Sequence, residues 1–183
     1  MRQKFFRKKL SMPGLLQEVK SFFQTITEPV TRQGAIPLVD CLLSSLAIFS
    51  LKYPSRLQFD KSRLEPVRAH NLKTLYRIRT IPSDTYLRER LDELNASELQ
   101  DAFTALIRQA RCCKVLERFS YYDGHYLLSI DGTGYFSSHE IHCKPCCEKH
   151  HRNGDITYYH QMLGAALVHP EHSHVLPLAP EPA

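Results

Sequence analysis

The chain has 183 residues, of which 43% are hydrophobic and 23% are charged. This balance is typical of folded globular proteins and excludes a mainly disordered chain. No apolar stretch approaches the roughly 20 residues that a membrane span needs. Pro13, Gln17 and Glu18 interrupt the region where a signal peptide would have its apolar segment. We therefore expect a cytoplasmic protein that does not cross a membrane and keeps its six cysteines reduced.

The net charge of +5 is mildly basic, and cationic side chains gather at the N-terminus. These residues are Arg2, Lys4, Arg7, Lys8 and Lys9. Such a run could neutralise a few DNA phosphates through counterion release. The alternative is a solvated, poorly ordered terminus, because chain ends are commonly of this kind.

The first two-thirds of the chain have the periodicity of helices. Apolar residues at spacings of three and four predict an amphipathic helix over residues 14–27. Residues 38–53 are apolar nearly all round and follow Pro37, so we expect a buried helix that ends at Pro54. Shorter helices with basic outer faces are expected at residues 54–60 and 71–78.

Two polar residues predict where the next helices begin. Ser83 is a good N-cap for a helix that runs to Leu94. Asn95 with Glu98 has the form of a capping box for another helix, which continues to about Cys112. Together these predictions give a helical module that covers residues 1–115.

From Phe119 onward the sequence changes to alternating stretches that are typical of strands. Residues 119–122 and 125–130 flank Asp123 and Gly124, a pair that readily takes the positive backbone angles of a hairpin turn. Further strands are expected at residues 156–168 and 175–178. We therefore predict an α+β fold, in which antiparallel strands of residues 116–183 follow the helical module.

Asp131 is the first candidate for chemistry, because it is expected at the end of a strand and Gly132 and Gly134 follow it. Glycines allow the backbone to turn away, so the carboxylate would project from a rigid edge and could bind Mg²⁺. The alternative is an aspartate that caps a turn through its own backbone, since Asp-Gly is a common turn dipeptide.

A second candidate site lies in residues 139–151, which are rich in cysteine and histidine. Cys143 and Cys146 form a Cys-x-x-Cys knuckle that can bind Zn²⁺, with His150 or His151 as a third ligand. The fourth ligand stays open among the nearby donors His139, His142 and Cys147. The alternative is a polar loop with reduced cysteines.

Residues 129–138 (SIDGTGYFSS) resemble the first catalytic segment of a family of bacterial insertion-sequence transposases with a ribonuclease-H-like core. Three further segments resemble the same family in the same order. They are residues 40–60 (DCLLSSLAIFSLKYPSRLQFD), residues 71–94, and residues 158–182 (YYHQMLGAALVHPEHSHVLPLAPEP). The resemblance extends from about residue 11 to the end of the chain.

The resemblance implies a DNA transposase of the Asp-Asp-Glu class. Such enzymes hold two Mg²⁺ or Mn²⁺ ions with two aspartates and one glutamate, and they cut and rejoin DNA at the terminal repeats of the element. It assigns Asp131 as the first catalytic and metal-binding residue, and residues 116–183 as the start of an incomplete ribonuclease-H-like domain. Residues 139–151 would be an insertion in that domain.

The remaining acids of the catalytic set are not predicted in this chain. The acidic residues after Asp131 are Glu140, Glu148, Asp155, Glu171 and Glu181. None of them is expected at the end of a fourth strand or on a late helix, where the family carries its second and third acids. We therefore expect a truncated fragment that does not cleave DNA by itself.

Basic side chains of the helical module are the candidates for contact with double-stranded DNA. They are Arg56, Lys61, Arg63, Lys73, Arg77 and Arg79. An ordinary solvated surface is the alternative, because charges this scattered need not form one patch. A second copy of the chain is a further expected partner.

Two other functions stay open. The first is a non-catalytic zinc- and nucleic-acid-binding remnant that interferes with an intact transposase. The second is a pseudogene product without a selected function.

Overall fold

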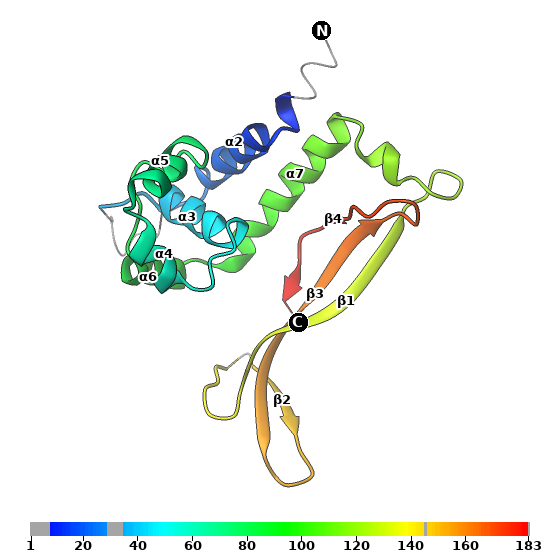
Figure 1. Cartoon of the computed structure of the whole chain (residues 1–183). Helices are drawn as coiled ribbons and strands as arrows, with labels where there is room; N and C mark the ends of the chain where they lie inside the picture. The colour runs from blue at the N-terminus through cyan, green and yellow to red at the C-terminus, as the bar shows by residue number, and fades with distance from the viewer. Residues whose placement is uncertain (1–7, 29–34, 145, 183) are drawn as a thin grey trace. The chain divides into compact units, whose positions relative to one another are not determined.

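The computed structural model describes residues 8–28, 35–144 and 146–182. The chain divides into two compact units, Met1–Gln109 and Ala110–Ala183, so that the division falls inside a helix (Figure 1). The first unit is helical and the second contains an antiparallel sheet, which confirms the predicted α+β composition. Of the N-terminal basic residues, Arg2, Lys4 and Arg7 lie outside the described residues, while Lys8 and Lys9 are exposed.

The helical unit follows the predicted order of elements. Its described helices are α2 (Met12–Phe23), α3 (Leu38–Ser50), α4 (Arg56–Ser62), α5 (Pro66–Thr74), α6 (Asp84–Asp92), the 3-10 helix η1 (Ala96–Leu99) and the start of α7 (Gln100–Cys112). Among the described residues, no helix combines the length and the apolar character that crossing a membrane requires.

Side-chain caps begin several of these helices. The Ser83 hydroxyl accepts a hydrogen bond from the Tyr86 amide at 3.4 Å, which confirms the predicted N-cap of α6. Asn95 accepts one from the Ser97 amide at 3.1 Å, but one 3-10 turn precedes α7. The prediction was less accurate for α5, which begins at Pro66 and ends at Thr74. The chain leaves the helix there and reaches a positive φ of 57° at Arg77.

Helix α3 lies at the centre of the hydrophobic core of this unit. Leu38, Cys41 and Leu43 are almost completely buried, in contact with core residues of the other helices. The same helix also buries Asp40, whose Oδ2 accepts hydrogen bonds from the amides of Arg79 and Thr80 at 3.2 and 2.8 Å. The predicted buried core helix is thus confirmed, and it additionally anchors the loop before α6.

In the second unit, β3 (Ile156–Val168) is the central strand of the sheet (Figure 1). On one side it pairs along its length with β1 (Leu127–Ser138). On the other side it pairs with three short strands, which are β2 (Cys147–His150), β5 (Glu181–Pro182) and β4 (Leu176–Pro177).

The predicted hairpin before β1 is present in a shorter form. Asp123 and Gly124 have φ values of 47° and 75°, as a tight turn of this kind requires. The Ser120–Tyr126 pair forms a single bridge, however, and Phe119, the first residue of the first predicted strand, belongs to the 3-10 helix η2 (Leu116–Phe119).

Candidate metal centre

Three donor atoms converge where the loop between β1 and β2 meets strand β3. The Sγ atoms of Cys143 and Cys146 are 3.4 Å apart, and they lie 3.0 and 3.3 Å from Nε2 of His160. Ligands around a tetrahedral zinc ion are roughly 3.5 Å from one another, as Zn–S and Zn–N bond lengths require. These three side chains could therefore hold a metal ion.

A tight turn and a strand bring the three side chains together. The Cys146 amide donates to the Cys143 carbonyl at 3.0 Å, and the Cys143 amide donates to the Cys146 sulfur at 3.2 Å. His160 lies on β3 opposite Phe136 of β1. The Tyr135 ring stacks on its imidazole with the centroids 5.7 Å apart, at a bulge in β1 that follows Gly134.

The predicted third ligand, His150 or His151, is wrong. His150 Nε2 is 3.3 Å from Glu148 Oε2, and His151 Nε2 is 2.8 Å from the Thr157 hydroxyl. The physical reason is that β2 begins directly after Cys146. Because an extended strand advances about 3.3 Å per residue, it carries these histidines away from the knuckle.

The sequence did contain a signal for His160. Thirteen residues separate it from Cys146, which falls within the range of roughly 12 to 15 residues between the Cys-x-x-Cys pair and the histidines of zinc fingers. The second histidine of such a finger is missing, so the pattern is incomplete. Because β2 pairs antiparallel with β3, the chain folds back after Cys146 and brings His160 close to the two cysteines.

The two thiols also influence each other. The hydrogen bond with Cys146 raises the pKa of the Cys143 thiol above its ordinary value. Thiolate is the form that binds metal, so a metal ion must displace the proton that this contact stabilises.

Asp131 lies within β1 and not at its end. The predicted turn after it is wrong, because β1 continues to Ser138 through pairing with β3. Gly132 therefore lies inside the strand and not in a turn. The carboxylate is exposed, and its Oδ1 accepts a hydrogen bond from the Gly132 amide at 2.8 Å. Among the described residues, Asp131 belongs to no group of three side chains that could share a metal ion.

The predicted DNA-contacting residues have different surroundings. Arg56 is paired with Asp84 at 3.3 Å, Arg63 is paired with Asp60 at 2.6 Å, and the Arg77 guanidinium donates to the Gln17 side chain. All of the set except Arg63 are exposed, and Lys61, Lys73 and Arg79 are the members without one of these three interactions. Three of the four arginines thus interact with other side chains of the protein, and contact with DNA stays a prediction.

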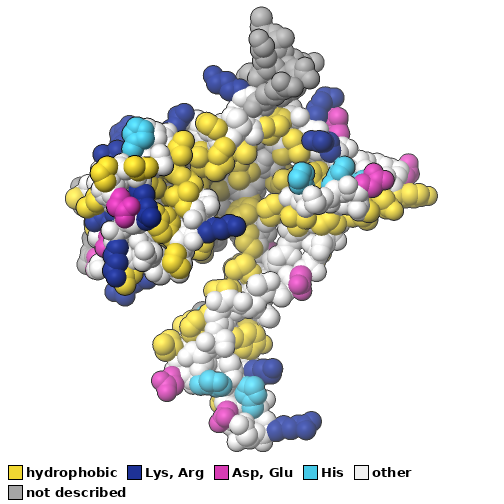
Figure 2. All heavy atoms as spheres, viewed as in Figure 1, with side chains coloured by type: hydrophobic (Ala, Val, Ile, Leu, Met, Phe, Trp, Pro, Cys, Tyr) yellow, Lys and Arg dark blue, Asp and Glu magenta, His cyan; other side chains and the backbone are white. Residues whose placement is uncertain are grey.

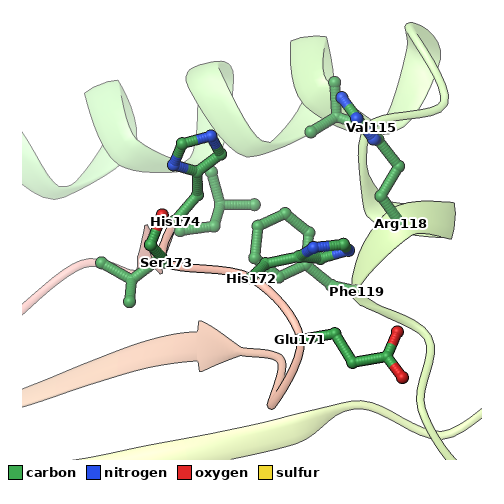
Figure 3. A pocket seen from close by; sticks show the side chains of 9 residues that line it. Val115, Arg118, Phe119, Glu171, His172, Ser173 and His174 are labelled. Carbon is green, nitrogen blue, oxygen red and sulfur yellow. The ribbon is translucent and has the colours of Figure 1, made fainter.

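A separate pocket of about 360 Å³ lies in the second unit, between η2 and residues 171–176 (Figure 3). Figure 3 shows Val115, Arg118 and Phe119 on one wall and the segment from Glu171 to His174 on the other. Its charged side chains, Arg118 and Glu171, have opposite signs. The pocket contains none of the three metal-binding side chains.

None of the protein-family models, curated proteins or solved structures that we compared with the chain matches it. The geometry of Cys143, Cys146 and His160 is therefore the strongest functional observation for this protein.

Proposed function

We propose that this chain is part of a DNA transposase of the Asp-Asp-Glu class, and that Cys143, Cys146 and His160 bind one structural Zn²⁺ ion in it. The convergence of these three donor atoms is the observation that carries the zinc proposal. Two thiolates and an imidazole favour Zn²⁺, whereas Mg²⁺ prefers oxygen ligands.

A structural role suits the surroundings of the site. We call residues 136–160 the Cys/His arm; it contains the end of β1, all of β2 and the start of β3. None of the described side chains of this arm is buried, so it lacks a hydrophobic core of its own. Small structures without a core commonly depend on a metal or on disulfides. At the end of the sheet that carries β2, acidic and basic side chains lie beside histidines (Figure 2). This mixture of charges does not favour a DNA-binding surface there, because such a surface would be mainly cationic.

The transposase proposal is supported by the position of Asp131. The resemblance implies that three antiparallel strands open the catalytic core, with the first aspartate on the first of them. Strands β1, β3 and β4 pair in this order, and Asp131 is exposed on β1. A single carboxylate binds a largely hydrated Mg²⁺ weakly, and strand transfer needs two ions. The chain alone is therefore expected to be inactive.

A nicking assay tests this proposal. The purified chain is incubated with Mg²⁺ or Mn²⁺ and a duplex that bears the element's terminal repeats, and no cleavage is expected. Metal-dependent nicking that disappears in Asp131→Ala would contradict the expected inactivity, and would mean that other acids or a second copy complete the site.

Binding to DNA is part of the same proposal and needs its own measurement. Replacing the exposed cations Lys61, Lys73 and Arg79 by alanine should weaken binding to any duplex and lower its salt dependence, because fewer phosphates would be neutralised. Lys149→Ala in the Cys/His arm is the matched control. Equal losses in both proteins would remove the helical unit as the DNA-contacting surface.

A cytoplasmic location is proposed from the state of the thiols. All six cysteines are free, and a reducing cytoplasm would keep them so. This location is part of the proposal.

The second candidate function is a non-catalytic zinc- and nucleic-acid-binding module. It is favoured by the contrast between the three convergent zinc donors and the solitary carboxylate of Asp131. Paramagnetic Mn²⁺ distinguishes the two functions. Broadening of the Gly132 amide resonance supports a catalytic ancestry for Asp131, and its absence at millimolar Mn²⁺ favours the non-catalytic module.

A further inference from the structure

The proposed zinc site has three ligands, whereas structural zinc sites almost always have four. Three more donors lie in the same part of the chain, and the structure distinguishes among them. They are His139, His142 and Cys147. If one of them is the fourth ligand, the site is closed. If none of them is, one coordination position is left for water.

Cys147 lies on the wrong face of the sheet. It pairs with Tyr159, which directly precedes His160 on β3. Successive side chains of a strand point to opposite faces, and residues paired across two strands share one face. The Cys147 thiol is therefore directed away from the face that carries the His160 imidazole.

His139 is also directed elsewhere. Its Nδ1 is 3.2 Å from the Ile156 carbonyl and 3.4 Å from the Thr157 hydroxyl. Thr157 is three residues from His160, so its side chain lies on the opposite face of β3. These contacts hold the His139 ring away from the two cysteines.

His142 lies on the correct face. Its ring stacks on Tyr158, with the centroids 4.3 Å apart and the planes inclined by 20°. Tyr158 is two residues from His160 and shares its face of β3. His142 also directly precedes Cys143, so it adjoins the knuckle in the chain.

The hydrogen bond of the His142 ring leaves one ring nitrogen available for coordination. Its Nδ1 lies 3.2 Å from the Glu140 carbonyl oxygen. A carbonyl oxygen can only accept, so in the neutral ring Nδ1 carries the proton and Nε2 has the lone pair. An Nδ1–H bond to a backbone carbonyl is a common way to fix the tautomer of a metal-binding histidine.

We propose that His142 is the fourth ligand, and that its ring leaves Tyr158 and coordinates through Nε2 when zinc binds. The resulting site has two thiolates and two neutral imidazoles, so the charge of Zn²⁺ is balanced. A third thiolate would instead leave a net negative charge. This inference rests on the proposed zinc binding and makes the site closed and structural, without a coordinated water.

Metal titrations of the full chain test this inference. Zinc affinity is measured by competition with a chelator, and the visible absorption of the Co²⁺-loaded protein reports the ligand set. His142→Ala should lower zinc affinity by about tenfold or more, the lower range reported for groups that support a metal site. It should also change the Co²⁺ spectrum. Added imidazole should restore both, because it can fill the vacated position.

His139→Ala is the matched control and should leave affinity and spectrum unchanged. The inference is overturned if His142→Ala binds zinc as tightly as the natural chain and gives the same Co²⁺ spectrum, since water would then occupy the fourth position. It is also overturned if both histidine variants lose affinity equally. Failure of the unaltered chain to take up any zinc is a different result, which rejects the proposed site itself together with this ligand.

Discussion

Eight of the thirteen residues of α3 are buried, whereas none of the twelve residues of β1 is. The helical unit is held together by a continuous hydrophobic core around α3. Among the described residues after Gln109, the buried hydrophobic ones are Ala110 and Phe119, so the sheet depends mainly on strand pairing. Side-chain packing therefore stabilises the helical unit, while backbone hydrogen bonds and the proposed metal stabilise the sheet unit.

The largest expected effect comes from truncating matched leucines in the two units. Leu43 is completely buried and Leu128 is 48% exposed. Leu43→Ala should lower the free energy of unfolding of the helical unit by about 2–5 kcal/mol, because it leaves a cavity. Leu128→Ala should change stability by less than about 0.5 kcal/mol. Urea unfolding followed by the helical circular dichroism signal, with amide exchange for the sheet, measures both; similar losses would contradict the comparison.

Raising the pH should destabilise the helical unit through Cys41. Burial raises the pKa of this thiol from 9.0 to about 11. The folded unit therefore favours the protonated thiol, while the unfolded chain loses the proton above about pH 9. The resulting stabilisation is fully present below pH 9 and is lost as the pH rises to about 11. The loss amounts to about 3 kcal/mol by linkage.

Comparison with Cys41→Ala isolates this contribution, since the other groups titrate in both proteins. The variant is less stable at neutral pH, but its stability should fall less between pH 9 and 11. Parallel pH dependences of the two unfolding free energies would show that the thiol is not protected by the core.

The smallest effect is expected for Asp131→Ala. The carboxylate is exposed, and its hydrogen bond is to the amide of the next residue. The free energy of unfolding should change by no more than about 0.5 kcal/mol, and zinc content should stay the same. Thermal unfolding with and without Mg²⁺ checks this. A loss well above 1 kcal/mol would assign Asp131 a structural role in the sheet.

The helical unit could be predicted well because its signals are local. The apolar run of α3 and the cap at Ser83 determine their elements within a few residues of sequence. The ends of α5 were less predictable, since the positive φ of Arg77 occurs where the chain packs back on the core.

The sheet unit was predicted less well because strand pairing joins distant residues. The sequence around Asp131 suggests a turn, yet pairing with β3 keeps this segment extended to Ser138. The same pairing explains why His160, and not the nearer His150, joins the two cysteines. Nothing in the local pattern shows which face of β3 a distant loop will contact.

Elemental analysis of protein purified without chelators tests whether Cys143, Cys146 and His160 bind zinc. About one zinc per chain is expected, as one tetrahedral site requires. His150→Ala, which removes the ligand that the local sequence favours, should retain this zinc, and His160→Ala should lose most of it. A zinc-free natural chain, or a His160→Ala variant with undiminished zinc, would contradict zinc binding by these three residues.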